Sequence, residues 1–441
     1  RNDWSSTLPK AERSYFYPGI TGSFIFTELI PKDLKDIISF GKVRVAWGKT
    51  GNDADWYSTQ NVYAQAGANG SGFGEIKFPL GGLNAFTLSN IMGNNKLKPE
   101  MTTEWEFGLN MAFFRNRLSF DFAYYNRSTN NQTLPMNLDA GTGFTRRYVN
   151  IGEITNKGVE LLVQGTPIKT RDWQWDLNMN WSLNRSKVVS LPKDLGKEIV
   201  IFGFSGGTSL YAVKGKPLGV YKDQRLERDP EGHVVVAANT GLPVKSDKYE
   251  YCGDMNHKYT LGWGTTLRWK DISLTANMEA RVGGKMYTCT KGTVFFTGIA
   301  KQTVYNDRKP FIVPNSVNKV TADDGSVSYV ENTTALDYNY IQSYWADQYD
   351  CDASNLVSRG FVKLRDVAVT WNVPKKWIDK TFLTGASVSF FGRNLLMWTP
   401  SDNTFVDPEN TSVSGDLAAM FGEYGANPST RSYGFNIKIS F

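Results

Sequence analysis

Residues 174–183 read QWDLNMNWSL, a stretch that alternates apolar and polar side chains without a break. Every second residue from Trp175 to Leu183 is apolar, and the residues between them are Asp, Asn or Ser. Side chains of an extended strand point alternately to its two faces, so a period of two predicts a β-strand with one apolar and one polar face.

The same alternation recurs along the chain. Residues 104–113, EWEFGLNMAF, and 118–125, LSFDFAYY, are separated only by a short turn at 115–117, which predicts a hairpin. A second hairpin is expected from LGWGTTLRW and ISLTANMEA, which turn at Lys270 and Asp271. Weaker patterns cover 15–28, 38–50, 146–166, 359–373, 384–398 and 432–441, which brings the total to about eleven strands.

The predicted strands have connections of two kinds. Some are a few residues long, as at 115–117, and others are long and rich in Gly, Asn, Asp and Tyr. The long ones are 51–100, 188–256, 289–358 and 399–430. Short turns at one end and long loops at the other are typical of a transmembrane β-barrel. A soluble sandwich shows the same alternation, because its apolar faces pack against each other, and the period alone leaves it open.

Three further features favour the membrane. The alternation lasts ten residues or more, whereas strands of soluble domains are usually five or six residues long. The polar faces carry more charge and amide groups than a packed interior can satisfy, namely Glu104, Glu106, Asp121, Asp176, Asn178 and Asn180. Aromatic residues gather near strand ends, as in the two interfacial belts of a barrel: Trp4, Tyr15, Phe16, Tyr17, Trp47, Trp173, Trp269, Trp371, Trp377 and Trp398.

Composition excludes several other classes of protein. The 441 residues include 60 aromatic residues and 41 Gly, a β-rich and turn-rich profile. No stretch reaches the 18 or so apolar residues of a membrane-spanning helix. The net charge of +6 is spread along the chain, so no nucleic-acid partner is expected. Three cysteines allow at most one disulfide, and pairing of Cys252 with Cys289 stays open. The chain starts without Met or a secretory signal, which indicates a processed or partial chain.

Residues 94–135, NNKLKPEMTTEWEFGLNMAFFRNRLSFDFAYYNRSTNNQTLP, closely resemble the barrel of SusC/RagA-type TonB-dependent outer-membrane transporters. The resemblance continues at 148–163, 361–377, 392–400, 407–410 and 428–441 and covers the whole chain. It implies an all-β fold: about 11 of the 22 strands of an antiparallel transmembrane β-barrel in a Gram-negative outer membrane. Its loops would be extracellular and its short turns periplasmic. Phe441 would be the terminal aromatic that the barrel-assembly machinery recognises.

The chain departs from the family at its beginning, because no plug, TonB box or N-terminal strands are recognisable. Residues 1–441 therefore look like the C-terminal part of the barrel. An odd number of strands is unusual for a closed bacterial barrel, and an open sheet exposes two unpaired edges to hydrocarbon. We expect the N-terminal plug-bearing portion to come from a companion polypeptide or from residues separated from this chain.

The resemblance also implies a function. The intact protein would import oligosaccharides or oligopeptides, be closed on the outside by a SusD-like surface lipoprotein and be opened by TonB. It would be surrounded by outer-membrane lipid, would not be an enzyme and would need no cofactor. Association of two transporter–lipoprotein pairs into a dimer is left open. The alternatives are a TonB-dependent siderophore or cobalamin receptor, a passive porin, and a soluble all-β carbohydrate-binding or hydrolytic protein.

Motifs for chemistry are scarce. Gly48-Lys49-Thr50 lacks the upstream Gly of a phosphate-binding loop. His233 and His257 are the only histidines and lie far apart in the sequence, which argues against a His-based metal site or a catalytic triad. Neither catalytic nor metal-binding residues are predicted. The acidic stretches DPEG at 229–232, ADDG at 322–325 and DPEN at 407–410 predict turns, with Ca²⁺ binding left open because none has EF-hand spacing.

Aromatic residues in the long loops are the candidate substrate contacts. Flat rings with hydrogen-bonding neighbours suit stacking on sugars or flanking a peptide. The candidates are Trp56, Tyr57, Tyr344, Trp345 and Tyr424. Packing of loop against loop is the alternative role for these rings.

Overall fold

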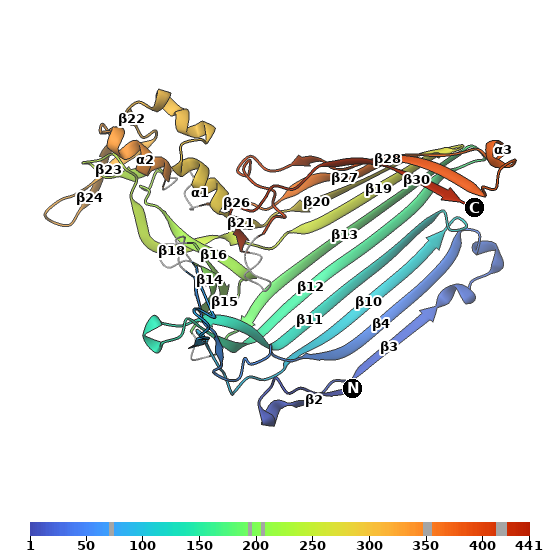
Figure 1. Cartoon of the computed structure of the whole chain (residues 1–441), viewed down its shortest axis with the longest axis horizontal. Coiled ribbons are helices and arrows are strands. Elements are labelled where there is room, and N and C mark those ends of the chain that lie inside the picture. The colour runs from blue at the N-terminus through green and yellow to red at the C-terminus, as the bar shows by residue number, and fades with distance from the viewer. Residues whose placement is uncertain (70–74, 193–195, 204–207, 347–354, 412–420) are drawn as a thin grey trace.

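Eleven long strands form one antiparallel sheet in the computed structural model, which describes residues 1–441 except 70–74, 193–195, 204–207, 347–354 and 412–420 (Figure 1). Each strand pairs with the next one in the chain. The strands are β3 (Gly19–Ile25), β4 (Ile38–Asn52), β10 (Glu100–Phe113), β11 (Leu118–Asn137), β12 (Arg146–Lys169), β13 (Trp173–Ser190), β19 (Tyr259–Trp269), β20 (Ile272–Val282), β27 (Phe361–Asn372), β28 (Gly385–Trp398) and β30 (Ser432–Ser440). The predicted all-β fold and the eleven strands are confirmed.

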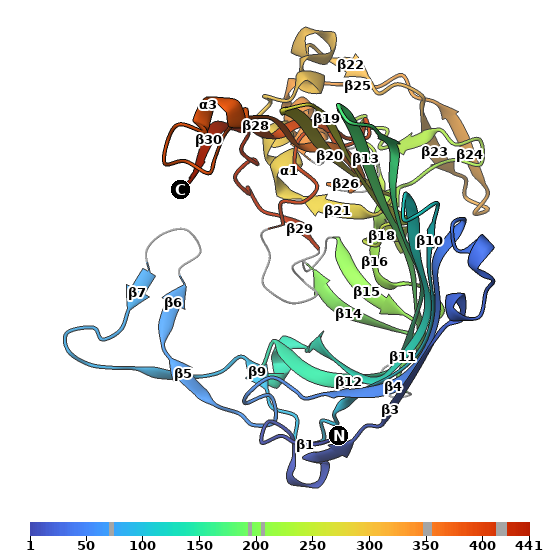
Figure 2. The same ribbon diagram turned by 90° about the vertical axis from the view of Figure 1, so that its right-hand side faces the viewer.

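The sheet is strongly curved, as Figure 2 shows with the strands seen at a steep angle. Its two edges are β3 and β30, and within the described residues each of them pairs on one side only. The short strand β9 (Ile91–Met92) adds a parallel pairing at the start of β12.

One end of the sheet carries the short connections. Residues 114–117 join β10 to β11, and 270–271 join β19 to β20. Phe114, Arg115, Asn116 and Lys270 have φ between 50° and 63°, the left-handed backbone that tight turns require and that few residues other than glycine adopt. Three short helical segments also lie between strands at this end: η2 (Phe26–Glu28), η3 (Lys32–Leu34) and α3 (Lys375–Ile378).

The other end carries long connections that fold into small sheets and helices, here called the loop assembly. Its strands include β5 (Tyr63–Gln65), β6 (Gly67–Asn69), β7 (Glu75–Lys77), β8 (Phe86–Leu88), β14 (Glu198–Gly203), β15 (Ser209–Val213), β16 (Leu218–Leu226), β17 (Val234–Val236), β18 (Lys245–Asp254), β21 (Lys285–Thr288), β22 (Phe311–Ile312), β23 (Ser316–Thr321), β24 (Val327–Glu331), β25 (Ala335–Leu336), β26 (Leu356–Ser358) and β29 (Gly422–Glu423). Its helices are α1 (Cys289–Phe296), α2 (Tyr338–Ala346) and the 3₁₀ segments η4 (Ala140–Thr142) and η6 (Lys301–Arg308). Near the N-terminus, β1 (Asn2–Trp4) pairs with β2 (Ser14–Phe16) beside η1 (Lys10–Glu12).

The hairpin of β11 and β12 is the longest in the sheet, with strands of 20 and 24 residues. At about 3.3 Å per residue these strands reach roughly 65 to 80 Å. A tilted strand needs only about 9 to 11 residues to cross a bilayer. The hairpin therefore continues well beyond membrane thickness into the loop assembly, where β11 lies against β14.

Apolar side chains on the outer face of the sheet are exposed, whereas the buried apolar clusters lie in the loop assembly. At the turn end, Trp173 pairs with Trp269, and Ile272 joins Trp269 to Trp371 in a continuous outward row. The rings of Trp173 and Trp269 stack with centroids 5.8 Å apart. Trp173, Trp269 and Trp371, three of the residues predicted for an aromatic belt, thus lie in one row of the sheet.

The largest buried apolar clusters are formed by chain segments beyond the membrane-length part of the strands. One joins the far ends of β11, β12 and β13 to β14 and β15 around Ile151, Ile154 and Val188. Another packs α1 against α2. In the described part of the chain, no helix is both long and apolar enough to cross a membrane.

Candidate functional site

The inner face of the sheet holds a polar hollow of about 870 Å³ between β4 and β13. Glu104, Glu106, Asp121 and Asn180 line it, as expected from the alternation. Asp176 and Asn178 line a smaller hollow of about 290 Å³ nearer the turns. The predicted polar face is therefore the concave side of the sheet.

Ion pairs organise this inner wall. Arg44 Nη2 lies 2.8 Å from Asp121 Oδ1, and Arg127 Nε lies 2.6 Å from Glu104 Oε2. Glu106 and Glu160 line the same hollow without an ion pair to any described residue. The wall thus presents more carboxylates than guanidinium groups to the interior, and it suits water or a polar ligand rather than an apolar one.

Two glycines on the inner face leave room for large side chains of the neighbouring strands. Gly108 pairs with Arg44 across the strands, and a Cβ atom at this position would overlap the guanidinium group. Gly158 pairs with Tyr125, and a Cβ there would overlap the phenol ring. Because Arg44 and Tyr125 lie flat over these glycines, they leave the space above the wall open.

The last long loop is bound to the sheet by what we call the charge clamp: Lys363, Arg365, Glu279, Arg281, Asp407 and Glu409. Lys363 Nζ lies 2.6 Å from both carboxylate oxygens of Asp407, and the Lys363 and Asp407 side chains are only 5% and 4% exposed. Arg365 forms two hydrogen bonds of 2.6 Å with Glu409. The predicted acidic turn at 407–410 therefore offers its carboxylates to cations of β27.

The clamp extends to the neighbouring strand β20. Glu279 accepts hydrogen bonds of 2.6 Å and 2.9 Å from Arg365 and one of 2.8 Å from Arg281. Arg281 also lies 3.1 Å from Glu409. Burial acts to raise the pKa of Glu409, but hydrogen bonds from Arg365 and Lys363 outweigh it and lower this pKa to about 2. Glu409 is thus fully charged at neutral pH and holds the loop against two strands.

The five predicted aromatic contacts fall into three separate places. Trp56 and Tyr57 lie in the connection after β4 with 80% and 65% of their surface exposed and with ring centroids 6.4 Å apart. Tyr344 and Trp345 lie on α2 and are buried in the apolar cluster with α1, which matches the loop-packing alternative. Tyr424 follows β29 and is 36% exposed, 5.8 Å from the ring of Tyr287. Ligand contact by these residues stays a prediction.

Glu423, which the sequence did not mark, anchors the segment beside Tyr424. Its fully buried carboxylate accepts hydrogen bonds of 2.9 Å from the backbone nitrogen and the hydroxyl of Thr290, and another from the Thr288 hydroxyl. These groups form the first turn of α1, where a negative charge is favourable. The partners are more than 130 residues apart, so no local pattern reveals this contact.

A second unpredicted contact involves Phe421, whose ring packs against Phe202, Tyr221 and Tyr287 with centroids 5.0 to 5.6 Å apart. The Tyr221 hydroxyl donates a hydrogen bond of 2.6 Å to the carbonyl of Phe421. Cys252 and Cys289, whose pairing the sequence left open, are both free thiols. Cys351 lies outside the described residues.

Comparison with protein families matches residues 1–395 to the β-barrel of TonB-dependent receptor-like proteins. The chain belongs to this family. TonB-dependent receptor P3 of Formosa agariphila is 25% identical over the whole chain and 43% of the receptor. SusC of Bacteroides thetaiotaomicron, also a TonB-dependent receptor, is 31% identical over 70% of the chain and 32% of SusC.

Solved structures of this barrel family share the fold. The RagAB peptide importer in its closed-closed state superimposes with a TM-score of 0.68 at 22% identity, over 100% of this chain and 45% of that one. The open-open state gives a TM-score of 0.67 at 21% identity, over 100% of this chain and 44% of that one. The chain spans less than half the length of these relatives.

Family membership confirms the predicted SusC/RagA-like barrel and its location in the outer membrane. It also explains the two faces of the sheet, since the exposed apolar side chains face lipid and the polar wall faces the interior. The soluble all-β alternative is excluded, and the family is one of receptors rather than enzymes.

Proposed function

We propose that this chain forms part of the barrel of a TonB-dependent importer that takes up oligosaccharides or oligopeptides across the outer membrane. The charge clamp carries the proposal, because it fixes a long loop to β20 and β27 at the ends of these strands that meet the loop assembly. An importer needs ordered outer loops above a polar interior, and the clamp and the inner hollow fit this requirement.

The open edges of the sheet support a partner that closes the barrel. Each backbone group left unpaired in hydrocarbon costs several kcal/mol, so β3 and β30 require neighbouring strands. We infer that an N-terminal portion of the same transporter supplies these strands and a plug, giving 22 strands in total as the family resemblance implies. Phe441, 86% exposed after β30, would then serve as the assembly signal.

We propose two further partners for the transporter. A SusD-like lipoprotein would lie above the loop assembly, and TonB would act on the plug from below. The similarity to SusC and to RagAB, the latter described as a peptide importer, supports this class of partner. Trp56 and Tyr57 fit a ligand-facing role better than Tyr344 and Trp345, because their rings are exposed. Transporter–lipoprotein pairs would associate as dimers.

The test starts from the intact transporter, extracted from outer membranes in mild detergent and purified through this chain. We expect a plug-bearing portion and a surface lipoprotein to co-purify, and glycan or peptide ligands to be identified by mass spectrometry. Trp56→Ala should weaken ligand binding, whereas Trp377→Ala at the turn end should not. Recovery of the barrel without a lipoprotein, together with binding of a ferric chelate or cobalamin, would favour the alternative receptor class.

A further inference from the structure

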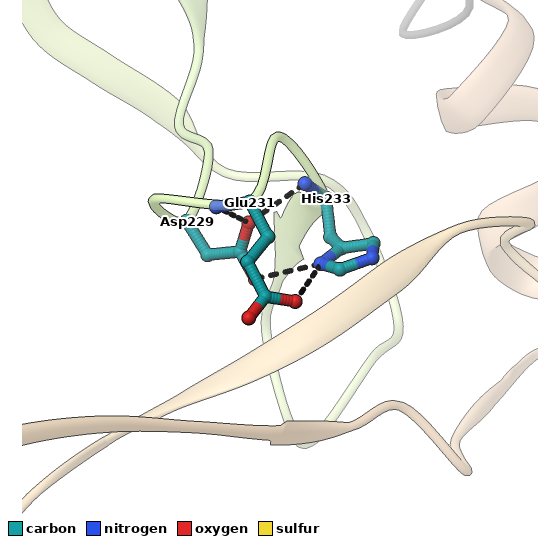
Figure 3. Close-up of side chains that lie close together, drawn as sticks. All are labelled: Asp229, Glu231 and His233. Atoms are coloured by element: carbon teal, nitrogen blue, oxygen red, sulfur yellow. Dashed lines mark hydrogen bonds and ion pairs between the residues drawn. The ribbon is translucent and has the colours of Figure 1, made fainter.

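We propose that Asp229, Glu231 and His233 form a binding site for a divalent transition-metal ion, with Zn²⁺ as the reference ion. The three residues lie on the turn that connects β16 to β17 in the loop assembly, and their side chains converge on one point (Figure 3). This site is independent of the proposed transport function.

The distances suit a metal ion after small side-chain rotations. His233 Nδ1 lies 2.7 Å from Asp229 Oδ2 and 3.8 Å from Glu231 Oε2. Bonds from Zn²⁺ to nitrogen and oxygen of about 2.0 to 2.2 Å place neighbouring tetrahedral ligands about 3.4 Å apart. The two observed separations lie on either side of that value, and all three ligand atoms lie within 4.8 Å of one another.

The backbone orients Asp229 as a ligand before any ion binds. Its Oδ1 atom accepts hydrogen bonds from the backbone nitrogens of Glu231 at 3.0 Å and of His233 at 2.7 Å. Gly232 has φ of +93°, the left-handed backbone that closes this turn. Oδ2 is therefore aimed at His233, and such hydrogen bonds to a ligand are the outer contacts that fix metal sites.

The remaining positions of a metal ion have room for water. The cluster borders a hollow of about 660 Å³, which Tyr329 and Glu331 of β24 also line. Glu231 is 81% exposed and rotates freely, whereas Asp229 is 6% exposed and fixed. One imidazole and two carboxylates suit Zn²⁺ better than Ca²⁺, which prefers six to eight oxygen ligands.

Protons compete with the metal at His233. His233 Nδ1 and Asp229 Oδ2 share one hydrogen bond of 2.7 Å, which a bound metal ion would replace. Of the other groups at the turn, Glu331 and Tyr329 face the hollow, and Arg228 donates a hydrogen bond to the carbonyl of Gly232. Zn²⁺ would take the place of the proton that His233 Nδ1 and Asp229 Oδ2 share.

The experiment titrates the intact, detergent-purified transporter with Zn²⁺ alone, using a chromophoric chelator as competitor. His233→Ala and Glu231→Gln remove single ligands without disturbing the backbone hydrogen bonds of Asp229. We expect one Zn²⁺ per wild-type chain and at least about tenfold weaker binding in each variant. Asp323→Asn, in the acidic turn between β23 and β24 that contains no histidine, is the matched control and should bind like wild type.

X-ray absorption at the zinc edge of the wild-type complex tests the site without any variant. One imidazole nitrogen and about three oxygen ligands are expected. Stoichiometric binding that His233→Ala leaves unchanged, an all-oxygen ligand shell, or no binding above the level of the His233→Ala/Glu231→Gln double variant would overturn the proposal.

Discussion

The charge clamp leads to a quantitative expectation for Glu409→Gln, which removes one charge and preserves the shape of the side chain. The Glu409 carboxylate lies 2.6 Å from Lys363 Nζ, 2.6 Å from two nitrogens of Arg365 and 3.1 Å from Arg281 Nη2. Each of these cations keeps a second carboxylate partner in the variant, so none is left buried alone. The cost therefore reflects the lost charge interactions of Glu409 itself.

The pKa of Glu409 gives the size of that loss. Burial opposes ionisation, but hydrogen bonds from Arg365 and Lys363 lower the pKa from 4.5 to about 2. At about 1.4 kcal/mol per pH unit this difference amounts to about 3 kcal/mol in favour of the charged form. Breaking a buried ion pair typically costs about 3 to 5 kcal/mol because one charge is left unpaired; here the cations keep other partners, so the cost should not exceed about 3 kcal/mol.

Hydrogen exchange of the loop measures this loss directly. For the intact transporter in detergent, a loss of about 3 kcal/mol corresponds to roughly hundredfold faster exchange of amides within 399–411. Glu198→Gln is the matched control, because Glu198 is 43% exposed and its pairing with Lys222 at 2.8 Å lies on the surface. Such pairs contribute about 0 to 1 kcal/mol, so this variant should change exchange little.

The pH dependence adds a second criterion. A carboxylate whose pKa is lowered by folding stabilises the folded loop above pH 4.5, and this stabilisation disappears as the pH falls towards 2. Wild-type protection, corrected for intrinsic exchange rates, should decline over that range, and the Glu409→Gln variant should lack this part of the decline. Exchange of the variant within about threefold of wild type at neutral pH would refute the clamp as a source of loop stability.

Three further predictions concern the wall and the base of the loop assembly. Leu274→Arg places a cation on the lipid face of β20 and should lower the stability of the folded barrel by about 2 kcal/mol, whereas Thr275→Arg points inward and should be tolerated. The folded fraction recovered from outer membranes distinguishes the two variants. Gly158→Ala brings a methyl group into the ring of Tyr125 and should destabilise the barrel by about 1 to 3 kcal/mol, with rescue by Tyr125→Ala, as measured by thermal unfolding. Burial lowers the pKa of His257 to about 4, so between pH 6.5 and 4 the unfolded loop binds a proton that the folded loop excludes. The local stability of the loop, measured by hydrogen exchange, should therefore fall as the pH drops from 6.5 to 4, and His257→Asn should remove this pH dependence.

The strands were predictable because their pattern is local. Alternation located all eleven strands of the sheet but not all of their bounds, and the stretch 15–28 contains the end of β2 and η2 as well as β3. The strand expected at 118–125 continues to Asn137, although NRSTNNQ at 126–132 has no alternation. These residues extend the strand because all of them except Asn131 have a backbone partner on β12, and pairing with a distant segment does not appear in a local pattern.

The loop contacts were predictable only in part. Exposed aromatic residues and acidic turns are visible in a sequence, but their partners are not. The turn at 407–410 is a turn, as expected, yet its role comes from Lys363 and Arg365, some 44 residues earlier. The metal site proposed above is the opposite case, since Asp229, Glu231 and His233 lie within five residues. Counting histidines argues against a His-based metal site, whereas the proposed site combines a single imidazole with two carboxylates.

The position of the clamp also shows how a barrel strand accommodates buried charge. Glu279 and Lys363 occupy paired positions on β20 and β27, on the face opposite the lipid. On the lipid face such charges would cost several kcal/mol each, whereas on the inner face they meet opposite charges from a loop. The alternation that keeps charge away from lipid therefore also gathers it where a loop can be fixed. The period-two alternation of β20 and β27 therefore determines both which side chains face lipid and where the loop with Asp407 and Glu409 is held.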